Sequence, residues 1–152
     1  MGITNSNKEV NVSQITCGGT FQVTLGLSAA PDILENPVDI VLVLDRSGSM
    51  AGSPLENLKL GADTFIDIIN ETTDSTQDGQ IGSGSHIGIV SFSSNASADT
   101  QLITSVADLK AAVAALSAGG STNHADAFST AASLFDPSSS NEKVIVMFTD
   151  GK

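Results

Sequence analysis

Oxygen-bearing side chains at three places along the chain are the residues whose types and spacing could do chemistry. The candidates are Asp45, Ser47, Ser49, Thr122 and Asp150. The first three alternate along the chain, so a tightly turning loop can direct all of them at one point, and Gly48 allows that turn. Carboxylates and hydroxyls, with no thiol or required imidazole, are the ligands that hard cations prefer. The pattern predicts a divalent-cation site, for Mg²⁺ in the first place, with Mn²⁺ or Ca²⁺ as alternatives.

The charge of this donor set indicates what the ion could bind. If the two carboxylates act through water, the three neutral hydroxyls leave a divalent ion under-neutralised. Such an ion would seek a further carboxylate, so we expect a protein partner that presents Asp or Glu.

Two apolar segments are expected to bring the carboxylates together. Residues 39–44 and 144–148 are nearly continuous apolar runs, which is typical of strands that are covered on both faces in a parallel sheet. Asp45 follows the first run and Asp150 follows the second. Because open α/β sheets bind ligands at the carboxyl edge of their strands, both carboxylates should face one crevice if the strands are neighbours.

The remaining segments between residues 38 and 152 alternate between strand and helix patterns. Further strands are expected over residues 86–92 and 101–104. Helices are expected after residue 53, from 106 to the Gly119-Gly120 pair, and over residues 124–135. This order predicts an α/β fold, a doubly wound and mostly parallel sheet with helices on both faces.

Capping residues indicate where these helices begin. Ser53 is expected as the N-cap of the first helix, with Pro54 at its first position and Glu56 completing a capping box. Ser105 and Asp108 form a similar pair before the second helix, and Asn123 and Asp126 do so before the third. Asn123 and Asp126 are interpreted as capping and supporting residues rather than as metal ligands.

The first part of the chain has a different character. Residues 1–37 are expected to form an N-terminal extension with one β-strand at about 20–27, followed by a linker that contains Pro31 and Pro37. Residues 1–19 are polar and show no periodicity. Cys17 is the one cysteine, so no intrachain disulfide can form.

The segments DIVLVLDRSGSM (39–50), GGSTN (119–123) and VIVMFTDGK (144–152) together resemble a von Willebrand factor type A (VWA) domain with its metal-ion-dependent adhesion site (MIDAS), as in integrin inserted domains. The resemblance implies a Rossmann-like sheet and a Mg²⁺-type ion that an acidic residue of the bound protein completes. It implies direct ligation by Ser47 and Ser49. Thr122 would be a direct ligand in the ligand-bound state and would act through water otherwise. Asp45 and Asp150 would act largely through water.

The resemblance covers about residues 38–152, and it implies that this segment is the N-terminal portion of a VWA domain. The family pattern continues with further strands and helices, so we expect C-terminal elements to be missing and the remainder of a parent protein to supply them. The strand at 144–148 would then be an apolar edge strand.

Composition excludes several classes of function. Seventeen acidic residues stand against six basic ones, which gives a net charge of −11. Such a chain repels phosphate backbones and anionic lipid head groups, so nucleic-acid binding is not expected. No apolar run approaches the roughly 18 residues of a membrane span, and direct membrane insertion is not expected either.

Three classes of function are weighed against one another. The first is a non-catalytic, metal-dependent adhesion or recognition module, part of a larger surface protein and located outside the cell or at its surface. The second is an intracellular assembly factor of the same family, as in chelatase-type or ATPase-associated complexes. The third is a Mg²⁺-dependent phosphohydrolase, but Ser47 stands where the Asp-x-Asp pattern of haloacid dehalogenase phosphatases has its general acid.

Overall fold

The computed structural model describes residues 2–10, 23–30, 36–74, 76 and 78–151. The chain divides into two compact units, residues 1–35 and 36–152, and each is described by itself. Cys17 and residues 20–22 of the expected first strand lie outside the described residues.

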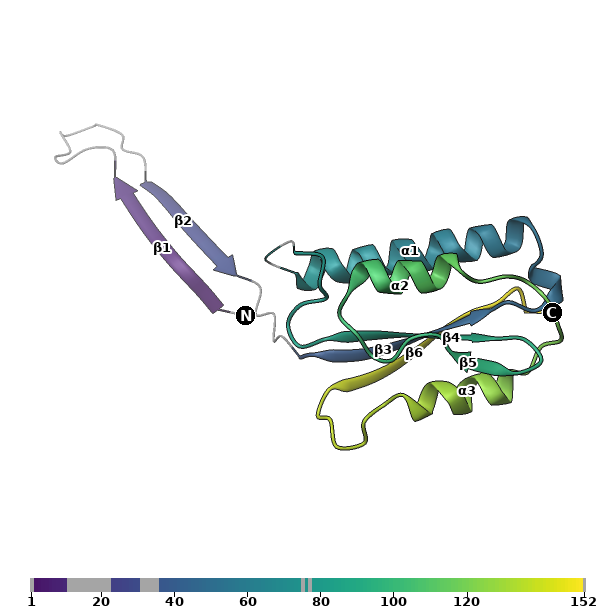
Figure 1. The fold of residues 1–152 in the computed structure, drawn as a ribbon. Helices are drawn as coiled ribbons and strands as arrows, with labels where there is room; N and C mark the ends of the chain where they lie inside the picture. Colours follow the sequence, from purple (N-terminus) through teal and green to yellow (C-terminus); the bar gives the residue numbers. More distant parts are fainter. Residues whose placement is uncertain (1, 11–22, 31–35, 75, 77, 152) are drawn as a thin grey trace, which may run out of the picture. The chain divides into compact units, whose positions relative to one another are not determined.

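The first unit contains a pair of antiparallel strands (Figure 1). β1 (Gly2–Val10) pairs with β2 (Val23–Ala30), and the register shifts between Ile3 and Asn5. A single strand at about 20–27 was expected, so β1 corrects that prediction. The polar sequence of β1 does not predict a strand, because backbone pairing with β2 needs no alternation of apolar side chains.

The second unit is built on a four-stranded sheet with the order β5-β4-β3-β6. β3 (Val38–Asp45) lies between β4 (His86–Phe92) and β6 (Glu142–Phe148) and is parallel to both. The side chains of β3 from Ile40 to Leu44 are buried, as a continuous apolar run predicts. β6 lies at an edge of the sheet, and Val144 on it is 40% exposed.

The expected strand at 101–104 is wrong. In this segment Ile103 makes one isolated antiparallel bridge to Ile87. The fourth strand is instead β5 (Ala96–Ala98), antiparallel to β4, in a segment for which no strand was predicted. β5 is only three residues long and consists of small residues, so it lacks the apolar alternation by which strands are recognised.

Three helices cover the two faces of the sheet (Figure 1). α1 (Ser53–Thr73) and α2 (Val106–Ala114) lie on one face, where Leu58, Ala62 and Leu109 join a core with Leu42 and Leu44. α3 (His124–Ser133) lies on the other face, where Ala127 and Ala131 pack with Val41, Val43 and Phe92. The doubly wound α/β fold is therefore confirmed.

Two helix ends differ from the prediction. α1 has Gly52, not Ser53, as its N-cap; its backbone has φ of 81° and its carbonyl accepts a hydrogen bond from Glu56 N at 3.2 Å. The left-handed turn at Gly52 starts the helix without help from a side chain. α2 ends at Ala114, before the expected Gly119-Gly120 stop. The caps at Ser105 and Asn123 are confirmed, each side chain accepting from the backbone N–H three residues on.

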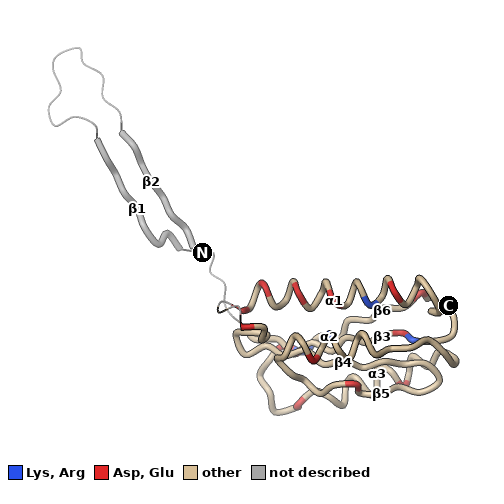
Figure 2. The backbone as a smooth tube through the Cα atoms, turned by 45° about the horizontal axis from the view of Figure 1, so that its top comes forward, with Lys and Arg blue, Asp and Glu red and all other residues tan. Residues whose placement is uncertain are grey.

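Within the described part of the chain, α1, α2 and α3 are all too short or too polar to cross a membrane. Acidic residues outnumber the single lysine along α1 (Figure 2). The surface of this unit is therefore electronegative on that side.

Candidate metal centre

Asp45 is the buried anchor of the loop that follows β3. It is 0% exposed, and both of its carboxylate oxygens accept hydrogen bonds. Oδ1 accepts from Ser47 N at 2.8 Å, and Oδ2 accepts from Thr149 Oγ1 at 2.7 Å. The carboxylate thus ties its own loop to the segment after β6, which lies next to β3 in the sheet.

Side-chain oxygens follow one another in a row above this anchor. Ser47 Oγ lies 3.2 Å from Ser49 Oγ, and Ser49 Oγ donates to Asp150 Oδ1 at 3.4 Å. Adjacent ligands of an octahedral ion with bonds of about 2.1 Å are about 3.0 Å apart. Hydrogen-bonded oxygens have similar spacings, so it is the chemistry of these side chains, carboxylate and hydroxyl oxygens, that fits a small hard cation.

Thr122 is brought to the same edge by its loop rather than by this row of oxygens. Gly48 N donates to Gly120 O at 2.9 Å, and Gly119 N donates to Arg46 O at 2.8 Å. The 119–123 loop is thereby joined to the 46–48 segment, and Thr122 follows two residues after Gly120. Of the five predicted residues, four are linked through side chains and Thr122 is linked through backbone contacts of its loop.

The number of carboxylates distinguishes this cluster from an all-acidic site. Among the residues that the structure describes, no group of three or more His, Cys, Asp or Glu side chains is placed to hold a metal ion. Any ion here would depend on hydroxyl ligands in addition to the carboxylates of Asp45 and Asp150.

The polar side chains next to the candidate ligands in sequence make structural contacts with the sheet and with α3. Arg46 Nε donates to Ser91 Oγ on β4 at 3.2 Å, so its stem runs toward the sheet. The ring of His124 is tilted against that of Phe92, with centroids 5.3 Å apart. Asn123 caps α3, and Asp126 Oδ2 accepts from Ala96 N at 2.6 Å. These contacts agree with the supporting roles expected for Asn123 and Asp126.

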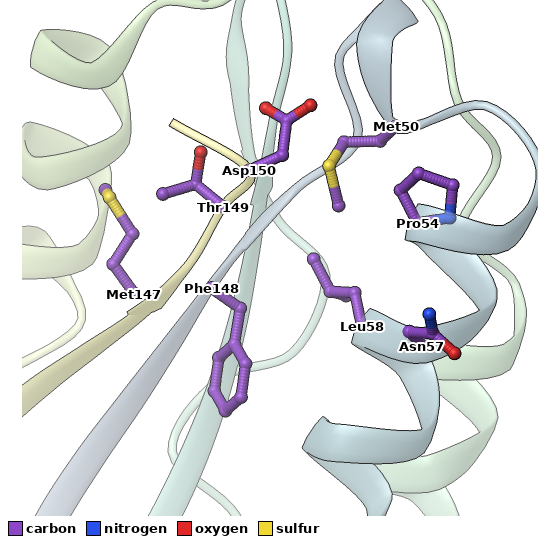
Figure 3. A pocket seen from close by; sticks show the side chains of 8 residues that line it. All are labelled: Met50, Pro54, Asn57, Leu58, Met147, Phe148, Thr149 and Asp150. Atoms are coloured by element: carbon purple, nitrogen blue, oxygen red, sulfur yellow. The ribbon is translucent and has the colours of Figure 1, made fainter. Parts of the chain in front are cut away.

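An apolar hollow of about 450 Å³ adjoins the cluster (Figure 3). Met50, Pro54 and Leu58 from the α1 side face Phe148 of β6 across it, and Thr149 and Asp150 lie at its upper rim in that view. This hollow has no signal in the sequence, because it depends on how α1 and β6 lie relative to each other. It places apolar surface directly beside a candidate ligand.

A second polar cluster lies at the opposite end of β3. Asp39 is 3% exposed and accepts from Asn141 Nδ2 at 2.9 Å, while His86 Nδ1 lies 2.9 Å from the same oxygen. Burial acts to raise the pKa of Asp39, but the hydrogen bonds from Asn141 and His86 outweigh it, and the pKa lies below its ordinary value of 3.8. This cluster joins three segments of the chain and is separate from the candidate metal centre.

Residues 40–152 match the model of the von Willebrand factor type A domain. The chain belongs to this family, whose domains generally mediate protein–protein interaction and are typically not enzymes. Comparison with curated protein sequences finds no match.

Solved structures show the same fold. The VWA domain of the type V pilus tip protein Mfa5 from Porphyromonas gingivalis matches with a TM-score of 0.65 at 24% identity, over 76% of this chain and 38% of that chain. Three N-terminal domains of Mfa5 match with a TM-score of 0.66 at 19% identity, over 99% of this chain and 27% of that chain. The present chain therefore spans well under half of either.

A third structure carries a metal in its own site. Proximal thread matrix protein 1 from the mussel byssus, solved with a zinc-occupied MIDAS motif, matches with a TM-score of 0.60 at 25% identity. The match covers 76% of this chain and 29% of that chain.

Proposed function

We propose that this domain is a metal-dependent protein-binding module whose ion is held at the carboxyl edge of β3 and β6. The observation that carries the proposal is the row of oxygens from Ser47 through Ser49 to Asp150, above the buried carboxylate of Asp45. Membership of the VWA family supports it, because these domains generally bind proteins.

In this proposal each residue has its own task. Ser47 and Ser49 ligate the ion directly, and Thr122 does so when a partner is bound. Asp45 and Asp150 hold the ion largely through water, and Asp45 also orders the loop through its bond to Ser47 N. When bound, the ion, Mg²⁺ in the first place, supplies positive charge that a partner's Asp or Glu carboxylate completes.

We further propose that the domain belongs to a larger extracellular or cell-surface protein. In that protein, residues 1–37 form an extension and residues 38–152 lie in the VWA domain. The match to a pilus tip protein and to a byssus matrix protein supports this location. The function is recognition or adhesion, without a catalytic step.

The proposal is tested by titrating the chain with Mn²⁺ and with Mg²⁺ by calorimetry. Ser49 is the middle residue of the 3₁₀ turn Gly48–Met50 and is exposed, so Ser49→Ala removes one donor with little effect on folding. We expect the dissociation constant for each metal to rise by about tenfold or more, because one of few direct ligands is lost.

Ser140→Ala is the matched control, because Ser140 is an exposed serine just before the amino end of β6, whereas the candidate ligands follow the carboxyl ends of the strands. It should bind metal as the wild type does. Equal metal affinities for Ser49→Ala and the wild type would refute the assignment of Ser49, and absence of binding by the wild type would refute the proposed function.

A further inference from the structure

The turn between β4 and β5 holds the loop that carries Thr122. Ser121 N donates to Ser94 Oγ at 3.0 Å, and Asn123 N donates to Ser93 O at 2.8 Å. Asn123 Nδ2 also donates to Ser94 O at 3.4 Å. The residues on both sides of Thr122 are therefore bonded to this turn.

Gly120 allows the turn and the loop to approach this closely. Its φ is 85°, and a Cβ atom at this position would lie 2.9 Å from Ser94 Oγ and 3.2 Å from Ser93 Oγ. A side chain there would push the loop away from the turn, or the turn away from the loop. The contact between them is thus built into the backbone at Gly120 and into the hydroxyl of Ser94.

The turn itself is anchored from a second direction. Ser93 is 6% exposed, and its N–H donates to Asn95 O at 3.0 Å. Ala96 N, at the start of β5, donates to Asp126 Oδ2 at 2.6 Å, and Asp126 N donates to Asn123 Oδ1 at 3.2 Å. The bonds form a closed circuit from the turn to the loop, through the first turn of α3, and back to β5.

We infer that Ser94 is a positioning residue for Thr122, acting through its hydrogen bond to the backbone of Ser121. The inference rests on the proposed metal centre, in which Thr122 holds the ion through water in the absence of a partner and ligates it directly when a partner is bound. Ser94 does not touch the ion. It fixes the position of the 119–123 loop relative to the row formed by Ser47, Ser49 and Asp150. The β4–β5 turn is then part of the metal centre, although its residues lie far from the family motif in sequence.

Metal affinity and backbone exchange test this inference together. Ser94→Ala should raise the Mg²⁺ and Mn²⁺ dissociation constants about three- to tenfold, the effect of one lost hydrogen bond. Amide hydrogen exchange at Ser121, measured by NMR without metal, should accelerate by a similar factor. Ser94→Thr, which keeps the hydroxyl, should restore both, and Ser97→Ala, an exposed serine on β5, should change neither.

The Thr122→Ala background separates positioning from a general loss of structure. If Ser94 acts through Thr122, then adding Ser94→Ala to Thr122→Ala should leave the metal affinity of the single variant unchanged. The inference would be overturned if Ser94→Ala weakened metal binding by the same factor in the wild-type and Thr122→Ala backgrounds, or if amide exchange at Ser121 were unchanged. The proposed function would stand in either case. Absence of metal binding by the wild type would overturn both.

Discussion

Asp45 is fully buried and lies beside a row of oxygen donors. Burial of a carboxylate is tolerated because Ser47 N and Thr149 Oγ1 each donate to it. The bond from Thr149 spans 104 residues, so sequence reasoning could identify Asp45 and Asp150 as neighbours but not Thr149 as the partner that satisfies Asp45. The bond to Ser47 is local, and the alternating pattern at 45–49 already indicated that this loop turns on itself.

Thr149→Val removes the hydroxyl and keeps the shape of the side chain. One oxygen of the Asp45 carboxylate then loses its donor, and we expect the free energy of unfolding to fall by about 1–3 kcal/mol. Thr149→Ser, which retains the hydroxyl, should lose less. Urea unfolding followed by far-UV circular dichroism measures both, since the chain has no Trp or Tyr. Equal losses in the two variants would show that the hydrogen bond is not the cause.

At the scale of elements, the strands and helices with strong apolar patterns were predictable and those defined by backbone contacts were not. β3, β4 and β6 have apolar runs, and α1 has an apolar stripe, so hydrophobic periodicity reveals them. β5 is short and consists of small residues, and the start of α1 depends on the left-handed backbone of Gly52. The 119–123 loop belongs to the second kind, because its position depends on contacts with the segments around Gly48 and Ser94.

Gly120→Ala tests whether this loop needs its close approach to the β4–β5 turn. The substitution meets both a positive φ and the Ser94 hydroxyl, so we expect a loss of about 1–3 kcal/mol in unfolding free energy. Gly119→Ala is the matched control, because a Cβ atom there meets nothing within 4 Å, and its effect should stay within about 0.5 kcal/mol. Chemical unfolding of the two variants side by side gives the comparison, and similar losses would contradict the account of the loop.

The polar cluster at the amino end of β3 predicts a dependence of stability on acid. The pKa of Asp39 is lowered in the folded chain, so the folded state favours the ionised carboxylate relative to the unfolded state. Its contribution is therefore fully present above the unfolded pKa of about 3.9. It is lost as the pH falls below that value and through the lower folded pKa.

Asp39→Asn should remove this part of the pH dependence. The unfolding free energy, measured in urea between pH 2.5 and pH 6, should decrease less steeply below about pH 4 in the variant than in the wild type. A parallel decrease in both proteins would show that other carboxylates account for the acid sensitivity.

At the scale of the whole molecule, the negative net charge of the chain is consistent with a cation site at the candidate metal centre. The chain has a net charge of −11, and acidic side chains lie along α1, which begins beside the candidate ligands (Figure 2). An acidic domain attracts cations and repels an acidic partner, so a bound divalent ion would reverse the local charge where that partner docks. This reversal is the physical reason for expecting that binding of the partner depends on the metal.

Thermal unfolding of the chain, followed by far-UV circular dichroism in EDTA and then in Mg²⁺, tests the central claim most directly. An ion present at about 100 times its dissociation constant stabilises the native state by about 2.7 kcal/mol. For a domain of this size, that free energy corresponds to a rise of about 10 °C in the midpoint. We predict this rise for the wild type and for Ser140→Ala, and about half of it or less for Ser49→Ala at the same metal concentration. A cooperative transition with the same midpoint in EDTA and in saturating Mg²⁺ would contradict the claim that these oxygens form a metal site.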